Sequence, residues 1–383
     1  CKHSRGSVED SVAERTGRQT NGIIGGRKSS VTMRPHYSLR SFRTKQSTCR
    51  ELNLPLRLCL FAGVLTFTIT SSTAQSFSFV NTPSSARLAA LGGVNVSLAD
   101  RDVNLFSSNP AINKDTLNGF ASANYHFYLA DVGQASFAIR PVIGSLGGVN
   151  IGIQHMGYGK IKGYDATGAE MGEFSSGETA LFIGKHFQSN AFRFGANIKT
   201  IFSNFAGYRA AALALDFGGL FVHPKQNLTV GLAIKNVGFT ISDFAEDSSS
   251  KLPFDVQVGT TFKPEHMPFR FSLTAFDLTD YNVYENETDK PSEVDKVMRH
   301  LNVGAELLLS KNVNVLFAYN FRKRQELRLE EISGGAGLSF GLSMRIKKME
   351  LVVNRASYGP GQAVYGFTLS ANLQQMIMKR EKI

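Results

Sequence analysis

Residues 300–321 read HLNVGAELLLSKNVNVLFAYNF, and this stretch decides the fold class. Apolar side chains fill every second position in both halves of it. The apolar positions are Leu301, Val303, Ala305, Leu307 and Leu309, then Val313, Val315, Phe317, Tyr319 and Phe321. Asn302, Gly304 and Glu306 occupy positions between them. Because successive side chains of a strand point to opposite faces, this period of two predicts two antiparallel strands joined at Ser310–Lys311.

The same alternation recurs along the rest of the body, for example in residues 192–200, 227–235 and 254–263. We expect an all-β protein with fourteen antiparallel strands, an even number that is typical of single-chain bacterial barrels. The predicted strands are 119–130, 133–141, 146–157, 173–187, 192–203, 207–222, 227–239, 254–263, 269–279, 299–309, 312–322, 333–346, 349–357 and 363–373.

The segment length and the connections favour a transmembrane barrel over a soluble β-sandwich, which would show the same alternation. The predicted strands run about ten residues, the length that crosses a bilayer at a tilt. From the second strand on, short connections alternate with mostly long ones, as in barrels with short periplasmic turns and long outer loops. The predicted short turns are 188–191, 223–226, 264–268, 310–311 and 347–348, and the predicted long loops are 158–172, 240–253, 280–298 and 323–332.

Residues 1–74 have the character of a leader rather than of a folded domain. Leu58–Thr70 is an apolar run that follows Arg50 and Arg57 and precedes a small-residue site. This order predicts a signal peptide cut between Ala74 and Gln75, although a buried core helix would also be apolar. Residues 1–32 are polar, and we interpret them as an extension from a wrongly assigned start, with Met33 as the true start.

The net charge of +11 belongs mostly to this leader. Residues 1–57 carry 12 lysines and arginines against four acids, which accounts for +8 of the total. A nearly neutral body lacks the electrostatic footprint of a nucleic-acid-binding protein. Cys1, Cys49 and Cys59 also precede the body, so we expect no disulfide framework or Cys-ligated metal there.

Residues 75–118 lack the alternation, and the barrel is predicted to span 119–375, followed by a tail at 376–383. The lumen of a 14-stranded barrel is too wide for its own side chains to fill. We therefore expect residues 75–118 to form an N-terminal plug, with a periplasmic tail as the alternative.

Two families resemble this chain at short motifs. Asn109-Pro110-Ala111 ahead of a 14-stranded barrel resembles the FadL superfamily of long-chain fatty-acid channels. The stretch NTPSSARLAALGG at Asn81–Gly93, together with YGKIKGY at Tyr158–Tyr164 and DATGA at Asp165–Ala169, is similar to the PorQ family. By this resemblance the plug motif comprises Asn81, Pro83, Arg87, Asn109 and Pro110.

The PorQ resemblance implies an outer-membrane component of the type IX secretion system of Bacteroidetes, a Gram-negative group. Its expected role is to hold a PorZ-like surface protein, with PorU and PorV in the wider attachment complex, where cargo is processed and linked to anionic lipopolysaccharide. The alternative is a FadL-type channel for long-chain fatty acids or other hydrophobic solutes. The outer-membrane lipid is an expected partner of the exterior, and a lipid bound in the lumen is left open.

The long loops are charged and aromatic, which fits either plain solvated surface or a surface that docks a partner. The candidate partner-binding residues are Lys160, Lys162, Tyr164, Asp165, Phe244, Tyr281, Tyr284, Arg324 and Arg328. Four charged residues are expected to face the lumen and to pair across the barrel, with a proton relay as the alternative. They are Arg193, Lys199, Asp255 and Glu306.

No motif in the chain indicates an enzyme. The histidines form no HxxxH or HxH pair, and the chain has no GxSxG elbow at a turn from a strand to a helix, no Walker GxxxxGK[ST] and no GxGxxG between a strand and a helix. We expect no catalytic residue, no metal site and no cofactor.

Overall fold

A computed structural model of the chain describes residues 76–245, 250–280, 292–327, 334–359 and 361–374. The predicted leader, its cleavage site at Ala74 and Gln75, and the predicted tail at 376–383 lie outside these residues. The described residues form the barrel and the segment that precedes it.

Fourteen antiparallel strands close into one barrel, as the alternation predicted. Each strand pairs with its neighbours in the chain, and β1 closes the ring by pairing with both β2 and β16, where Tyr125 lies opposite Phe367. The strands are β1 (Phe120–Phe127), β2 (Gly133–Ile139), β5 (Asn150–Tyr164), β6 (Glu170–Ser189), β7 (Phe192–Phe205), β8 (Tyr208–Val222), β9 (Leu228–Ser242), β10 (Asp255–Phe262), β11 (Phe269–Ala275), β12 (Leu301–Leu308), β13 (Val313–Asn320), β14 (Leu338–Ile346), β15 (Met349–Gly359) and β16 (Gln362–Asn372).

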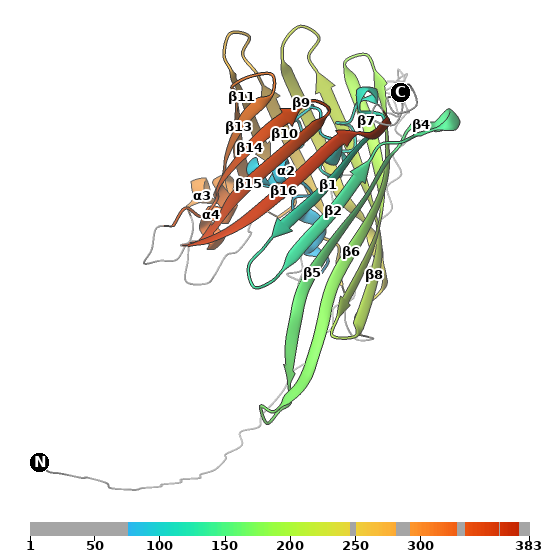
Figure 1. Cartoon of the computed structure of the whole chain (residues 1–383), viewed down its shortest axis with the longest axis vertical. Coiled ribbons are helices and arrows are strands. Elements are labelled where there is room, and N and C mark those ends of the chain that lie inside the picture. The colour runs from blue at the N-terminus through green and yellow to red at the C-terminus, as the bar shows by residue number, and fades with distance from the viewer. Residues whose placement is uncertain (1–75, 246–249, 281–291, 328–333, 360, 375–383) are drawn as a thin grey trace, which may run out of the picture. The chain divides into compact units, whose positions relative to one another are not determined.

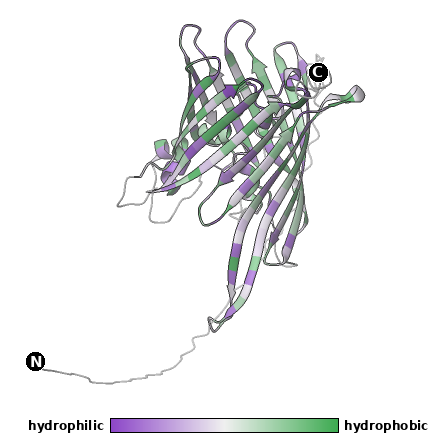
Figure 2. Ribbon diagram, in the orientation of Figure 1, coloured by the Kyte–Doolittle hydropathy of each residue, from purple (hydrophilic) through white to green (hydrophobic). Residues whose placement is uncertain are grey.

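The faces of the strands follow the predicted alternation. In β12, Val303 points outward and is 41% exposed, whereas Asn302 and Glu306 point into the lumen and are each 1% exposed. Hydrophobic and hydrophilic residues follow one another along the strands in Figure 2. A closed antiparallel barrel has no unpaired strand edge, and an apolar exterior suits hydrocarbon, so this is the architecture of an outer-membrane β-barrel.

One end of the barrel, which we call the turn end, holds the connections that the sequence predicted to be short. Phe187, Phe192, Phe194 and Phe221 cluster there, with ring centroids of Phe192 and Phe221 5.2 Å apart. Aromatic girdles of this kind lie at the membrane interface of barrels. None of the helices in the described part of the chain has the length and apolarity that a bilayer span needs.

The opposite end, which we call the loop end, holds most of the connections that the sequence predicted to be long. The connections 243–254, 276–300 and 321–337 are long, whereas β7 and β8 are joined by Ala206 and Gly207 alone. The predicted strands 192–203 and 207–222 also left only three residues at this position, so the long connections prevail at this end without exhausting it.

The largest correction concerns the predicted strand 146–157 and loop 158–172. β5 continues to Tyr164 and β6 begins at Glu170, so the two strands project as a long hairpin beyond the rest of the barrel (Figure 1). Lys160 pairs with Glu173 at 3.0 Å across this hairpin, and Lys162 pairs with Glu170 at 3.2 Å. Both faces of the hairpin meet water, so its sequence lacks the apolar alternation by which strands were recognised.

Short elements fill the remaining connections. β3 (Val142–Ile143), η4 (Gly144–Leu146) and β4 (Gly147–Gly148) lie between β2 and β5, which places the true start of β5 after the predicted residue 146. α3 (Glu293–Arg299) and α4 (Phe321–Leu327) lie at the loop end. Strand β13 gives way to α4 at Asn320, whose side chain accepts a hydrogen bond from the Lys323 amide at 3.0 Å.

Candidate functional site

Residues 76–118, which we call the hatch, lie inside the barrel and run from its loop end to its turn end. At the loop end, the Ser76 amide donates to the Lys251 carbonyl at 3.1 Å. At the turn end, Arg140 donates to the Asn118 side chain at 3.0 Å. The hatch contains η1 (Ser78–Asn81), α2 (Ala86–Ala90), η2 (Val103–Ser107) and η3 (Asp115–Leu117), and α2 is visible between the strands in Figure 1. Whether the hatch stops solutes, as a plug would, stays a prediction.

The Asn109-Pro110 pair holds the hatch against β7 and β8. The Asn109 side chain donates to the carbonyls of Val96 at 2.8 Å and Gly219 at 3.2 Å. Pro110 lies so near to Gly195 that an added Cβ there would come within 2.4 Å of the proline carbonyl carbon. A glycine at this wall position is therefore required by the approach of the hatch backbone.

Arg87 joins the hatch to the opposite part of the wall. Its guanidinium lies 2.5 Å from Asp100 in the hatch and 3.0 Å from Glu306 in β12, and it is 1% exposed. Arg270 of β11 contacts the same two carboxylates. Alternating charges thus form a network in which Arg87 and Glu306 are buried and Asp100 and Arg270 are half-buried, and each charge has a partner of opposite sign. A third acid, Glu350, lies 3.9 Å from Arg87.

The other two residues of the predicted plug motif also contact the wall. The Pro83 carbonyl accepts a hydrogen bond from Gln134 at 2.9 Å. Asn81 accepts one from Asn236 at 3.0 Å. Asn236 has a φ of 60°, and its side chain also reaches the Pro253 carbonyl at 2.6 Å. The hatch is thereby tied to β2 and to the middle of β9.

A second buried ion pair lies next to Asn236. Lys199 of β7 is 2.7 Å from Asp216 of β8, and both side chains are at most 1% exposed. Lys199 also donates to Asn236 at 2.5 Å. The pairing register of β8 with β9 shifts between Leu215 and Phe217, at the position of Asp216. The pair therefore stabilises an irregular part of the wall where the hatch enters.

The prediction that charged residues pair across the barrel is wrong for Glu306 and Lys199. Glu306 pairs with Arg87 of the hatch and Arg270 of the neighbouring strand β11, and Lys199 pairs with Asp216 of the neighbouring strand β8. Arg193 instead donates to the Ile112 carbonyl at 3.2 Å, and Asp255 accepts from the Gln257 amide. The partners are on the hatch or on neighbouring strands, because the hatch occupies the space between opposite walls.

The loop-end mouth of the barrel holds an aromatic pocket of about 400 Å³, which we call the mouth pocket. Its aromatic lining residues are Phe77, Tyr158, Phe205, Tyr208 and Phe244. Phe244 stacks on Phe77 of the hatch at 6.2 Å between ring centroids and meets Phe205 at 5.9 Å. The Glu178 carboxylate lies in the lining, where it accepts hydrogen bonds from Tyr158 and from Ser203.

The structure separates the predicted partner-binding residues. Lys160, Lys162 and Tyr164 lie on strand β5 rather than in a loop, and Asp165 begins the turn of the hairpin. Hydrogen bonds from the Thr167 hydroxyl and the Ala169 amide lower the pKa of Asp165 below its ordinary value. Of the predicted candidates that the structure describes, Phe244 is the one that lines the mouth pocket. Arg324 lies on α4, where it donates a hydrogen bond to the Gly334 carbonyl at 2.5 Å. The predicted candidates Tyr281, Tyr284 and Arg328 lie outside the described residues.

Four acidic or basic residues of the site were not singled out from the sequence. Asp100 lies in the hatch, and Glu178, Asp216 and Arg270 occupy lumen-facing or half-buried positions on strands. The alternation of the strands gives the direction of the last three side chains, but it does not show which residues of other strands or of the hatch they contact. No group of three or more His, Cys, Asp or Glu side chains within the described ranges is arranged to hold a metal.

Comparisons with known proteins give no family assignment. No protein-family model matches the chain, and no curated protein matches it. Among solved structures, a mutant of the TodX monoaromatic hydrocarbon channel superposes with a TM-score of 0.42 at 12% identity, covering 75% of this chain and 96% of that chain. The CymD monoaromatic hydrocarbon channel gives 0.42 at 9% identity, covering 78% and 97%. A Pseudomonas aeruginosa FadL homologue gives 0.41 at 9% identity, covering 76% and 98%.

These scores are too low to carry an argument about function. The strand order, the closure between β1 and β16 and the outward apolar face show by themselves that the described chain is an outer-membrane β-barrel.

Proposed function

We propose that the protein is a closed outer-membrane barrel that holds a partner protein at its loop end. The observation that carries the proposal is the network of Arg87, Asp100, Arg270 and Glu306, which fixes the hatch to the wall. Arg87 lies 2.5 Å from Asp100 and 3.0 Å from Glu306, and Arg270 lies 2.7 Å from Asp100. Removing one member of a buried ion network costs about 3–5 kcal/mol, so a hatch held in this way is expensive to displace. A barrel whose hatch stays in place is suited to act as a scaffold for a partner protein.

The β5–β6 hairpin supplies a rigid surface for such a partner. Its strands remain paired from Lys160 opposite Ser175 to Tyr164 opposite Glu170, and its charges are exposed. A pre-ordered surface loses less conformational entropy on binding than a flexible loop does. The resemblance to the PorQ family names the partner in this proposal: a PorZ-like surface protein of the type IX attachment complex of a Bacteroidetes cell.

The test is recovery of the partner from outer membranes solubilised in mild detergent. In one variant, residues 160–173 are replaced by a two-residue Asn-Gly turn, which closes the shortened hairpin. The matched control exchanges Lys347–Lys348, at the opposite end, for the same turn. We expect the surface partner to be recovered with the parent chain and with the control, and to be lost with the shortened hairpin. Equal recovery with all three would contradict the proposal.

A second function is favoured by the mouth pocket, because an aromatic cavity of about 400 Å³ has the size and lining of a site for an apolar small molecule. In this alternative the chain is a channel for hydrophobic solutes, and the hatch would have to move. The test is uptake of a labelled long-chain fatty acid by a deletion strain that carries either the parent chain or Phe205→Ala with Phe244→Ala. Lower uptake by the strain with the double variant than by the strain with the parent chain would support the channel. Equal uptake by the strain with the parent chain and the strain without the gene would exclude it.

A further inference from the structure

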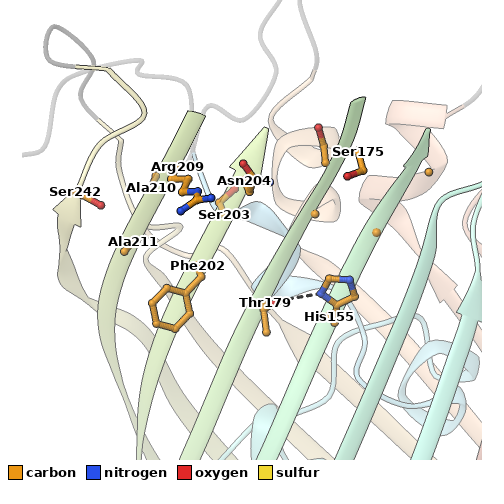
Figure 3. Close-up of a pocket in the computed structure, with 14 residues that line it drawn as sticks. His155, Ser175, Thr179, Phe202, Ser203, Asn204, Arg209, Ala210, Ala211 and Ser242 are labelled. Atoms are coloured by element: carbon orange, nitrogen blue, oxygen red, sulfur yellow. Dashed lines mark hydrogen bonds between the residues drawn. The ribbon is translucent and has the colours of Figure 1, made fainter. Parts of the chain in front are cut away.

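The outer surface of the barrel carries a hollow of about 680 Å³ across β5 to β8. We call it the exterior hollow. His155, Thr179, Phe202 and Ala211 are cross-strand partners in one row, and Figure 3 shows this row along the loop-end part of the strands. Phe202 is 50% exposed, and Ser203, the next residue, is 3% exposed, so the row belongs to the outward face. The exterior hollow is thus separate from the mouth pocket, which lies on the inner side of the same strands.

Two glycines make the hollow. Gly157 and Gly177 lie opposite each other in the next row toward the loop end. A Cβ added to Gly157 would meet only the His155 ring, with the nearest atom at 3.7 Å. The Nδ1 of His155 is 2.8 Å from the Thr179 hydroxyl, and its Nε2 lies over the glycine pair. The imidazole is therefore held at the edge of the hollow with one nitrogen facing it.

The hollow lies where the apolar belt ends. Toward the turn end, the same outward face presents Ile153 and Leu181, which are 40% and 43% exposed. Toward the loop end it presents Asn204 and Arg209, which face each other across β7 and β8. An apolar-to-polar change on a barrel exterior marks the interface between hydrocarbon and lipid head groups. Because long loops face outward in such barrels, this interface belongs to the outer leaflet.

The lining is basic and rich in neutral hydrogen-bond donors. It contains Arg209 and His155, the hydroxyls of Ser175 and Thr179, and no Asp or Glu. Neither Arg209 nor His155 makes an ion pair with a carboxylate in the part of the chain that the structure describes. Guanidinium and hydroxyl groups are the usual ligands of phosphate oxygens.

We propose that the exterior hollow binds one phosphorylated lipid of the outer leaflet. The phosphate lies over the Gly157–Gly177 pair and accepts hydrogen bonds from Arg209 and His155. An acyl chain lies along Phe202 and Leu181. A surface that faces the membrane is covered by lipid. A phosphate-bearing head group fits the exterior hollow better than a neutral one does, because the lining is basic and lies at the edge of the apolar belt. The inference requires a membrane barrel but neither of the two functions proposed above.

Native mass spectrometry of the full chain in a neutral detergent tests this, with bisphosphorylated lipid A as the probe and phosphate-free lipid A beside it. The variants are Arg209→Gln, which removes the charge, and Gly177→Leu, which fills the hollow without touching the hatch. The matched control is Arg355→Gln, which changes an exposed arginine on β15, away from the hollow.

We expect one bisphosphorylated lipid A to bind the parent chain and the Arg355→Gln control. Arg209→Gln should weaken binding about tenfold, since a charge-assisted hydrogen bond is lost. Gly177→Leu should abolish binding, and its unchanged melting temperature would show that the barrel is intact. Inorganic phosphate at millimolar concentration should not displace the lipid, because the acyl contact is missing. Three results would each overturn the proposal. The first is binding of phosphate-free lipid A equal to that of the bisphosphorylated form, the second is a loss of binding in Arg355→Gln equal to that in Arg209→Gln, and the third is full lipid occupancy in Gly177→Leu.

Discussion

Arg87 and Glu306 are 219 residues apart in the chain, yet the guanidinium of the first donates to the carboxylate of the second at 3.0 Å inside the barrel. This contact fixes helix α2 of the hatch to β12. The wall and the hatch are therefore one structure, and the properties of the lumen depend on residues that come before the first strand.

Replacing Arg87 with Met should loosen the hatch. The variant leaves Asp100 and Glu306 with Arg270 as their shared partner, and the loss of one buried charge costs about 3–5 kcal/mol. We expect a lower unfolding temperature and a measurable ion conductance in planar bilayers, where the parent chain conducts little.

The control for this variant is Arg101→Met, since Arg101 is an exposed hatch residue whose guanidinium lies over the Phe120 ring. The control should behave as the parent chain does. An Arg87→Met barrel with the conductance and unfolding temperature of the parent would show that the network does not hold the hatch.

Gly195→Ala should destabilise the barrel through the hatch. The new methyl would lie 2.4 Å from the Pro110 carbonyl carbon, and forced overpacking typically costs about 1–3 kcal/mol. Gly219→Ala on the next strand is a matched control, because an added Cβ there meets nothing within 4 Å. Urea unfolding in lipid vesicles measures both. If the two variants lost equal stability, the close approach of the hatch to β7 would be refuted.

Lys199 and Asp216 should behave as a coupled pair. Lys199→Met leaves a buried carboxylate without its charged partner and should cost about 3–5 kcal/mol, whereas adding Asp216→Asn should recover part of this loss. A double-mutant cycle on unfolding free energies measures the coupling. Additive losses would mean that the 2.7 Å contact contributes no pairwise stability.

The barrel could be predicted from the sequence because each strand has two different environments. Val303 meets hydrocarbon and Asn302 meets the hatch, so the alternation of the residues records both sides of the wall. The end of the β5–β6 hairpin was predicted as a loop because residues such as Lys162 and Glu170 are in water, and a strand without two environments has no period to detect. The helix α4 was missed because its start depends on a single cap at Asn320.

The site was predictable only in part, for a physical reason. The motif residues Asn81, Arg87 and Asn109 were recognised by resemblance, but their partners lie on strands more than 100 residues away. The mouth pocket combines Phe77 of the hatch with Phe244 beyond β9, and no local pattern brings these together. Such contacts depend on where the chain threads the closed barrel.

Labelling of single cysteines in intact cells tests the central claim, a membrane barrel filled by its hatch, most directly. With Cys1, Cys49 and Cys59 replaced, the chain has no thiol, so each new cysteine reports alone. We predict that a membrane-impermeant maleimide labels Thr167→Cys, at the hairpin turn, in intact cells. The same reagent should label Lys347→Cys, at the turn end, only after the outer membrane is opened. Ala90 is 0% exposed in the hatch, so Ala90→Cys should not be labelled until the protein is unfolded. Rapid labelling of Ala90→Cys in the folded protein, or of Lys347→Cys in intact cells, would contradict the account.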